Sequence, residues 1–575
     1  MSVATILARS AFKTIREWSD LYETLTTLEA GGGGGGDTIT GGALEPRSLS
    51  QAKANATLFS DFSPAGDGTT NDSDPFIDAV TAALADDTNL FMGYHVLYLD
   101  EVGRYALENP VFTSISNLMI IGEGDRAVLV ERTGSAAWMS FVSYTNIAIL
   151  NVGFDKHGTS PFGGVRMVAG NGFWFQGNHM WDSLSPGLDN AGDLDHFAIG
   201  SSGGALNPNE NWLVTRNFFE DLQPSFGPLR HFEYSFNTVV RGGMATAGVG
   251  FWANSDGWMI EDGTIAYNKF IDCRGPALAI EKDVFSANNT SFQRLFVGFN
   301  EFDFLNYAQT GMRFGTTNDS VQQTTDIFKD WYIVGNVFRY PRYVPSGPND
   351  AAMKAFVPAD SFVFDHFTIQ GNRIEGLGYP GGFAGGMLLY AMKNSYVESN
   401  VVEAGGIQVF GVPTIPANNK VRNNVCAGYV IGDSHGDFIF TNNRMHSVLV
   451  ASLGQSNIDG TGNDIDTPTL ITDGPGTRYE YNFRVANLEG WDPANLADGA
   501  SATQTFTITG ASTSLHMVRS VWLPSISATI GWVVTGTVSA ADTVTVKLTN
   551  NTGGAVDLGE QDVYITLEKR PTLAV

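Results

Sequence analysis

Three segments in the middle of the chain, "GVGFWANSD", "GPALAIEKD" and "TGMRFGTTND", place polar and aromatic residues where they could act on a sugar chain. In each segment, alternate apolar residues are expected to face a protein core, so the residues between them face outward. The outward residues, with those that follow at the rim, are Trp252, Asn254, Asp256, Glu281, Asp283, Arg313 and Asp319. The segments therefore predict one surface patch with carboxylates, an arginine and an aromatic ring.

The chemistry that suits this patch is the cleavage of a glycosidic bond. Hydrolysis requires one carboxyl group as an acid and a second as a base or nucleophile. We predict Glu281 as the general acid and Asp256 or Asp283 as its partner. Elimination instead requires a base and a group that stabilises developing negative charge. The sequence leaves hydrolysis and elimination open.

The remaining residues of the patch are predicted to bind the substrate. Trp252 could stack on a sugar ring, and Arg313 could hold an acidic sugar. Asn254 and Asp319 lie beside them on the rim or in the following loop.

Other acidic residues compete with this assignment. Glu220, Asp221 and Glu233 form a second set one to two repeats earlier. Glu301 and Asp303 lie near a bend and are predicted to be structural. Outward acids on an acidic protein are commonly exposed to solvent without any further role. A purely solvated surface is therefore the alternative to a catalytic role for these residues.

No metal or cofactor is expected. "DNAGDLDH", with Asp193, Asp195 and His196, does not fit a calcium-loop spacing and is interpreted as a turn. The nine histidines form no pair with metal-ligand spacing, and no order of serine, histidine and aspartate indicates a catalytic triad.

The strands that are expected to carry these residues belong to an irregular sequence repeat. Alternating apolar residues lead to an asparagine, as in "WYIVGN", "FTIQGN" and "DFIFTNN", at intervals of 19 to 39 residues. The repeated asparagines are Asn178, Asn217, Asn237, Asn268, Asn300, Asn336, Asn372, Asn400, Asn424, Asn443 and Asn463. A period of this length with one strand pattern per unit predicts a solenoid. An asparagine at each bend can satisfy backbone groups, and stacked amides can form a ladder.

Glycine-marked segments such as "GVGFWAN" and "GGIQVFG" follow many of these bends, so each coil should have at least two strands. Neighbouring parallel strands lie about 4.8 Å apart, which makes a parallel β-helix a ruler for side chains on successive coils. Loops of varying length would account for the uneven spacing, and loops commonly carry function.

The segment "DFSPAGDGTTNDSDPFIDAVTAA" resembles the opening of the pectate-lyase-like right-handed β-helix superfamily. The resemblance covers residues 58–467 and implies an all-β, right-handed parallel β-helix. Asp74 is predicted to cap a helix that starts at Pro75. The apolar face of this helix, Phe76, Ala79, Val80 and Ala83, is expected to cover the open end of the first coil.

The layout of the whole chain resembles that of a bacteriophage tailspike. Residues 1–30 are predicted as an amphipathic helix that attaches to the virion, and residues 31–57 as a glycine-rich flexible linker. The helix could instead pack on its own domain or form a short coiled coil. Residues 468–575 alternate apolar and polar residues and predict a small antiparallel β-sandwich for trimerisation or glycan binding. A non-enzymatic tail fibre and a cellular polysaccharide lyase remain alternatives.

The resemblance implies partners and a location. A tailspike is usually a homotrimer that binds, and often cleaves, a bacterial surface polysaccharide such as capsule or lipopolysaccharide. It folds in the host cytoplasm, joins phage tail or baseplate proteins, here through residues 1–30, and acts on the virion at the host surface.

Composition agrees with this interpretation. The 575 residues include 66 glycines and carry a net charge of −27, which argues against binding nucleic acid or anionic membranes by bulk electrostatics. No apolar run of about 18 residues predicts a membrane span, and the first residues do not resemble a secretion signal. Cys273 and Cys426 are expected to be buried thiols.

Overall fold

The computed structural model describes the chain from residue 49 to residue 569 with gaps. The described residues are 49–54, 56–88, 90–132, 138–156, 164–182, 197–202, 208–242, 247–253, 257–282, 290–305, 310–316, 327–340, 351–356, 364–376, 386–403, 405–410, 418–433, 438–451, 458–459, 464–465, 471–472, 491–508, 511–514, 516–523, 526, 531–561 and 563–569. The predicted N-terminal helix and most of the linker lie outside them.

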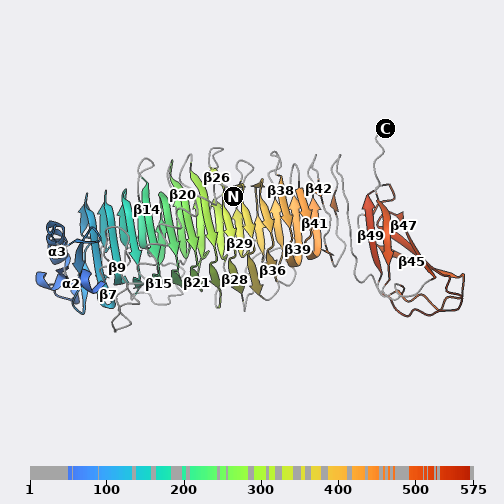
Figure 1. The fold of residues 1–575 in the computed structure, drawn as a ribbon, viewed down its shortest axis with the longest axis horizontal. Coiled ribbons are helices and arrows are strands. Elements are labelled where there is room, and N and C mark those ends of the chain that lie inside the picture. Colours follow the sequence, from blue (N-terminus) through green and yellow to red (C-terminus); the bar gives the residue numbers. More distant parts are fainter. Residues whose placement is uncertain are drawn as a thin grey trace, which may run out of the picture.

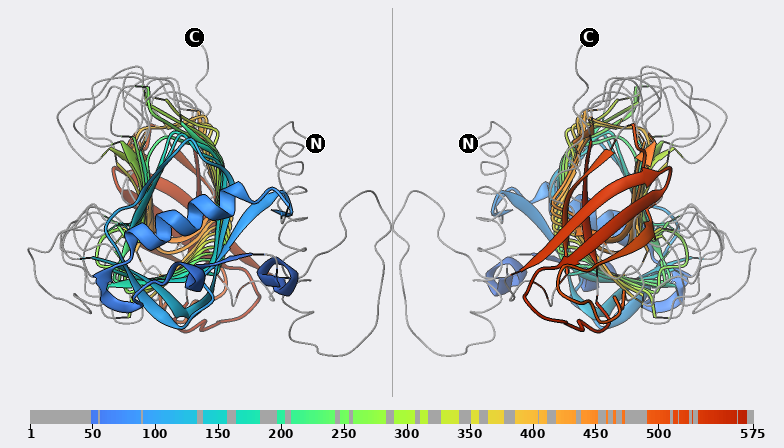
Figure 2. Two further views of the ribbon diagram at one scale, coloured as in Figure 1. Left: turned by 90° about the vertical axis from the view of Figure 1, so that its left-hand side faces the viewer. Right: turned by 90° about the vertical axis from the view of Figure 1, so that its right-hand side faces the viewer.

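Within the described residues, the strands from β1 to β44 pair almost entirely in parallel and wind as a β-helix. Figure 1 shows the coils stacked along the long axis, and Figure 2 shows three sheets end-on as the sides of a triangle. The sequence predicted at least two strands per coil, and the structure has three. The additional strand is often only three residues long, which is too short for a periodic pattern.

The first sheet contains β1 (Thr57–Leu58), β4 (Tyr94–Tyr98), the first halves of β7 (Ser116–Glu131) and β9 (Thr145–Lys156), β11 (Asn171–Gln176), β14 (Asn209–Thr215), β17 (Leu229–Ser235), β20 (Met259–Ala266), β23 (Ser291–Gly298), β26 (Ile327–Lys329), β27 (Tyr332–Val334), β30 (Phe364–Asp365), β31 (Thr368–Gln370), β34 (Met392–Lys393), β35 (Tyr396–Glu398), β38 (Asn419–Arg422), β40 (Phe438–Thr441) and β42 (Ile458–Asp459). The short β3 (Leu90–Phe91) pairs with β4 in antiparallel orientation.

The second sheet contains β2 (Asp67–Asn71), β5 (Gly103–Leu107), the second halves of β7 and β9, β12 (His179–Asp182), β15 (Phe218–Glu220), β18 (Thr238–Val240), β21 (Lys269–Ile271), β24 (Glu301–Asp303), β28 (Val337–Tyr340), β32 (Arg373–Gly376), β36 (Val401–Val402), the first parts of β39 (Val425–Asp433) and β41 (Arg444–Ala451), and β43 (Asp464–Ile465).

The third sheet contains β6 (Val111–Thr113), β8 (Met139–Val142), β10 (Val165–Val168), β13 (Phe197–Ser202), β16 (Gln223–Phe226), β19 (Val249–Ala253), β22 (Leu278–Lys282), β25 (Met312–Thr316), β29 (Met353–Phe356), β33 (Met387–Leu389), β37 (Ile407–Phe410), the last parts of β39 and β41, and β44 (Ile471–Thr472).

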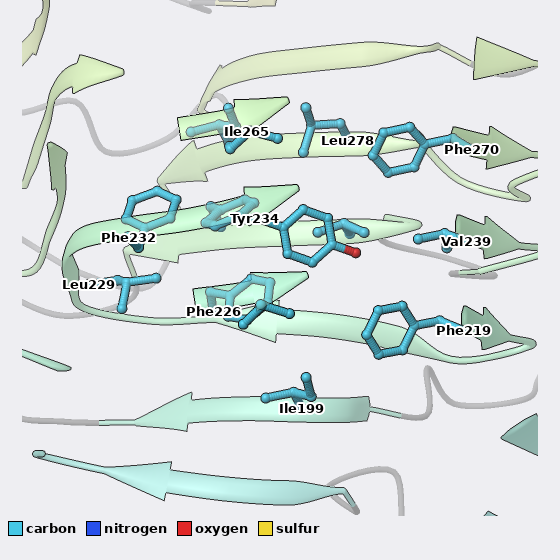
Figure 3. Close-up of a cluster of buried hydrophobic side chains, with 14 of the residues drawn as sticks. Ile199, Phe219, Phe226, Leu229, Phe232, Tyr234, Val239, Ile265, Phe270 and Leu278 are labelled. Atoms are coloured by element: carbon cyan, nitrogen blue, oxygen red, sulfur yellow. The ribbon is translucent and has the colours of Figure 1, made fainter. Parts of the chain in front are cut away.

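The interior of the triangle is filled by apolar side chains from all three sheets. Figure 3 shows Phe219 of the second sheet, Phe226 of the third and Phe232 of the first pointing into the same space. Rings on successive coils stack there, as for Phe270 and Phe302 with centroids 4.8 Å apart. This continuous core fixes which residues of each strand face outward.

The asparagine ladder is confirmed for ten of the eleven predicted residues, from Asn178 to Asn443; Asn463 lies outside the described residues. Asn268 Nδ2, for example, donates to Oδ1 of Asn300 (3.0 Å) and to the backbone oxygen of Tyr234 (2.9 Å). All ten are buried at the corner between the first and second sheets. They satisfy turn groups that would otherwise be buried without partners.

Helix α3 (Ser73–Ala85) covers the first coil, as predicted, and Figure 2 shows it lying across that end. Its predicted apolar face is buried, and Phe76 contacts Phe59 of the 3₁₀ helix η1 (Phe59–Phe62) with ring centroids 5.6 Å apart. The predicted cap was wrong: the helix begins at Ser73, so Asp74 lies in its first turn. Asp72 precedes it and accepts hydrogen bonds from the backbone of Ala65 and Ala106.

A second unit has its own apolar core near the C-terminus. One antiparallel sheet contains β45 (Ser501–Thr507), β48 (Thr543–Asn550) and β47 (Trp532–Ala540), and another contains β46 (His516–Trp522) and β49 (Tyr564–Lys569). A Cβ atom on Gly536 would lie 2.7 Å from a methyl carbon of Val518 in the other sheet, so the glycine permits close packing. The predicted antiparallel β-sandwich is confirmed.

Two further expectations concern the described residues. Cys273 and Cys426 are buried and form no disulfide. Neither of the described α-helices, α2 (Leu49–Ala54) and α3, is long and apolar enough to span a membrane.

Candidate functional site

Three of the predicted site residues lie together on the outer face of the third sheet. Trp252 on β19 is in register with Glu281 on β22, which is in register with Gly315 on β25. Arg313 precedes Gly315 by two residues on the same strand. The apolar residues that were predicted to face inward on these strands belong to the core.

Glu281 and Arg313 form a closely held ion pair. Arg313 donates from Nε to one carboxylate oxygen of Glu281 and from a terminal nitrogen to the other, at 2.9 Å for the second bond. Glu281 is 0% exposed, although its strand position faces outward. A buried carboxylate with both oxygens engaged by an arginine is suited to positioning or charge stabilisation.

The other four predicted site residues, Asn254, Asp256, Asp283 and Asp319, lie outside the described residues. The partner carboxylate of Glu281 and the polar rim of this patch therefore stay predictions.

The competing acids on the second sheet are paired with arginines. Arg241 contacts Glu220 (2.6 Å) and Asp221 (2.9 Å). Arg339 contacts Glu301 (3.1 Å) and Asp303 (3.0 Å). Such pairs link successive coils, which agrees with the structural role predicted for the last two acids.

Glu233 has a different environment. It lies on β17 of the first sheet, in register with Leu213 of the preceding coil and Thr264 of the next. Among the described residues, no cation pairs with it; the Ser235 hydroxyl donates to its carboxylate. Burial raises the pKa of Glu233, and the Ser235 hydrogen bond opposes this only in part. A partly buried carboxyl group with a raised pKa is the usual form of a general acid.

A second carboxylate lies near Glu233 on the next coil. Glu261 on β20 is in register with Arg230, three residues before Glu233. Arg294 donates to it at 3.0 Å and the Ser291 hydroxyl also donates to it. Both carboxylate oxygens of Glu261 are thus engaged by cationic and hydroxyl donors.

Three exposed aromatic rings stack at the edge of the same face. Phe236, Tyr267 and Phe299 are 44–49% exposed. Their centroids are 5.0 and 5.2 Å apart and their planes differ by 6° and 12°. The spacing matches one coil per ring.

The backbone of these three residues is strained. Phe236, Tyr267 and Phe299 have φ values of 55°, 58° and 57°. Glycine takes this left-handed corner position in other coils, at Gly177, Gly335 and Gly371. A bulky residue rarely adopts this conformation. Arg216 and Ser399 also occupy this corner, so the feature that sets the three residues apart is a large exposed ring.

The sequence interpretation did not identify this aromatic stack. Its signal was present in "SFNTV", "AYNKF" and "GFNEF", where an aromatic residue comes directly before a ladder asparagine.

Metal ligation has no support in the described part of the chain. No group of three or more histidine, cysteine, aspartate or glutamate side chains is arranged to hold an ion there. Asp193, Asp195 and His196 lie outside it.

Comparisons with solved structures return the tailspike protein of E. coli bacteriophage HK620. Its complex with a pentasaccharide is 10% identical to this chain, with a TM-score of 0.44. Two mutant forms are 11% identical, with TM-scores of 0.47 and 0.46. Each comparison covers 95% of this chain and 99% of the other.

No protein-family model matches the chain, and no curated protein sequence matches it. The sequence predicted a parallel β-helix, and this is the fold that the structure has.

Proposed function

We propose that the outer face of the first sheet binds a bacterial surface polysaccharide and hydrolyses its glycosidic bonds. The observation that carries the proposal is the strained, exposed stack of Phe236, Tyr267 and Phe299 on the same face as a carboxyl group of raised pKa, Glu233. An exposed aromatic surface can contact the apolar C–H faces of sugars, and a protonated carboxyl can activate the leaving oxygen.

Glu233 donates the proton in this scheme, and Glu261 acts as the base. The strand geometry places their Cα atoms no more than about 11 Å apart, on adjacent coils and three residues apart along the strand. Two outward glutamates at this offset suit the wider separation of an inverting hydrolase, about 6.5–9.5 Å between carboxyl groups. We therefore propose hydrolysis with inversion.

The patch on the third sheet is the alternative site of cleavage. There Glu281 would act with Asp256 or Asp283, while Trp252, Asn254, Arg313 and Asp319 would bind the sugar chain. The ion pair between Glu281 and Arg313 favours the first sheet for the acid.

We further propose that the chain is the tailspike of a bacteriophage and forms a homotrimer. Residues 1–30 would attach it to a tail or baseplate protein, and the C-terminal β-sandwich would contribute to trimerisation or glycan binding. Its ligand would be capsule or lipopolysaccharide, with no contact to nucleic acid and no insertion into a membrane. The sequence layout supports this proposal.

The experiment is to incubate the purified protein with capsules and O-polysaccharides from a strain panel and to separate the products by size. A hydrolase produces shorter chains with new reducing ends. A lyase would instead produce unsaturated ends that absorb ultraviolet light. Binding to a polysaccharide whose length does not change would support the non-enzymatic tail fibre.

A further inference from the structure

A cavity of about 280 Å³ opens on the outer face of the second sheet, in the first coils behind α3. Its polar walls are Arg104 of β5, Asp125 and Arg126 of β7 and His179 of β12, and Trp181 of β12 completes it. None of these residues belongs to either site described above.

The strand register explains why a hollow forms here. Arg104, Val128, Gly153 and His179 occupy one outward row on four successive coils. Because Gly153 has no side chain, Val128 and the Trp181 ring close over it, and the hollow lies beside them. A Cβ atom on Gly153 would lie 3.1 Å from a methyl carbon of Val128 and 3.4 Å from the Trp181 ring.

Trp181 supplies an apolar wall. It is half-buried and packs on the outer cluster of Ala106, Val128 and Val130. Its ring lies 4.6 Å from that of His179 between centroids. A large aromatic ring fixed on one side and open on the other is suited to the apolar face of a ligand.

Each arginine at the cavity forms an ion pair with a carboxylate. Arg104 pairs with the buried Asp155. Arg126 lies 3.1 Å from Glu123 outside the cavity. An arginine has five N–H donors, so each guanidinium keeps donors beyond the one engaged here. Balanced charge combined with many donors and acceptors favours a neutral polyhydroxyl ligand over an anion.

The histidine provides an independent sign. His179 Nδ1 lies 2.8 Å from Asp125, while its Nε2 atom is shielded from solvent and has no hydrogen-bond partner in the described part of the chain. A buried polar atom of this kind calls for a partner, and an ordered water or a bound ligand is one that the protein itself does not supply.

We propose that this cavity binds a single neutral sugar residue, with the sugar's C–H face on Trp181 and its hydroxyls on Arg104, Arg126 and Asp125. The volume is just below the usual range for ligand pockets, about 300–1,000 Å³, which suits one pyranose ring and not a longer chain. The site lies on another sheet from the proposed cleavage site, so it would anchor a glycan separately from cleavage.

The test is saturation-transfer NMR on the full chain with methyl glycosides of glucose, galactose, mannose, rhamnose and N-acetylglucosamine, each at about 10 mM, a concentration suited to millimolar affinity. We expect at least one neutral glycoside to bind. Trp181→Leu should weaken that binding about tenfold, as loss of an anchoring aromatic does. Arg126→Ala, at an exposed ion pair, should weaken it with little effect on folding. Arg104 is not substituted, because its removal would break the ion pair with the buried Asp155 and could destabilise the fold.

Ile271→Ala is the control, because Ile271 is a half-buried, outward residue of the second sheet, three coils further along the row that contains Trp181. It should not change the signal. Methyl glucuronide is measured beside the neutral glycosides as an anionic sugar. The proposal is overturned if no neutral glycoside binds, if methyl glucuronide alone binds, or if both cavity variants bind as well as the control. Polysaccharide cleavage should persist in Trp181→Leu, so a failure of this proposal is distinguishable from a failure of the proposed hydrolase.

Discussion

At the scale of single residues, burial and neighbouring side chains distinguish two acids that follow the same pattern in the sequence. Glu281 and Glu233 both alternate with core residues and both face outward. One is buried under an arginine, and the other is half-buried without a cationic partner in the described part of the chain. The alternation predicted their direction. Their partners depend on neighbouring coils, which single-sequence patterns do not place.

The raised pKa of Glu233 has a consequence for stability. The native state holds this proton more tightly than the unfolded state, so the carboxyl lowers the free energy of unfolding as pH rises from the ordinary value of 4.5 through the raised pKa. Glu233→Gln should therefore gain stability relative to wild type over that interval, and the difference should be constant at lower pH. Unfolding midpoints in urea at a series of pH values check this. A pH-independent difference would contradict it.

The aromatic stack gives a second test at this scale. Tyr267→Asn should weaken polysaccharide binding about tenfold, while stability stays equal or rises by about 1 kcal/mol because asparagine tolerates the left-handed backbone. Arg216→Asn is the control: Arg216 has the same corner conformation, with φ 56°, but no ring. Glycan binding by immobilised protein and native mass spectrometry provide the readouts. Unchanged glycan binding with loss of oligomers would instead identify the stack as a subunit contact.

At the scale of elements, the ladder was predictable because its asparagines do the same work in every coil. The third strand of each coil was not predictable, since segments such as β15, β18 and β21 have three residues each. The aromatic corner was hidden for a related reason, because the residue before each asparagine varies from glycine to arginine to phenylalanine.

The ladder should be sensitive at its centre. Asn300→Ala removes bonds to the Ile265 carbonyl and to the backbone and side chain of Asn268. Each buried polar group that loses its hydrogen-bond partner costs about 1–3 kcal/mol. We therefore expect the free energy of unfolding to fall by about 3–5 kcal/mol in total. Asn171→Ala removes an exposed amide that accepts from Asn211 and should change stability by less than about 0.5 kcal/mol. Equal urea midpoints for the two variants would contradict a structural role for the ladder.

At the scale of the whole molecule, the lid, the solenoid and the sandwich were each predictable because each has a local signature. The helix that covers the first coil has a buried face that the apolar spacing identified. Its capping residue was misplaced by two positions, because Asp72 and Asp74 are both acids before the apolar face and only the fold shows that Asp72 holds the backbone of Ala65 and Ala106.

Helix α3 should protect the open end of the solenoid core from solvent and from other chains. Phe76→Ala should cost about 3–5 kcal/mol and increase aggregation, because it uncovers the first coil. Ile77→Ala, on the half-exposed side of the same helix, should change stability by about 0.5 kcal/mol. Thermal unfolding followed by light scattering distinguishes them. Equal aggregation of both variants would show that α3 is not needed as a cover.

The central claim is that Glu233 donates the proton that breaks a glycosidic bond of a bound surface polysaccharide. The most direct measurement is the rate of formation of new reducing ends by wild type, Glu233→Gln and Glu281→Gln on a polysaccharide that all three bind. The account predicts a loss of about a hundredfold or more for Glu233→Gln, the scale of general acid catalysis, with affinity retained. It predicts a much smaller loss for Glu281→Gln. Full activity of Glu233→Gln, or loss in Glu281→Gln alone, would contradict it.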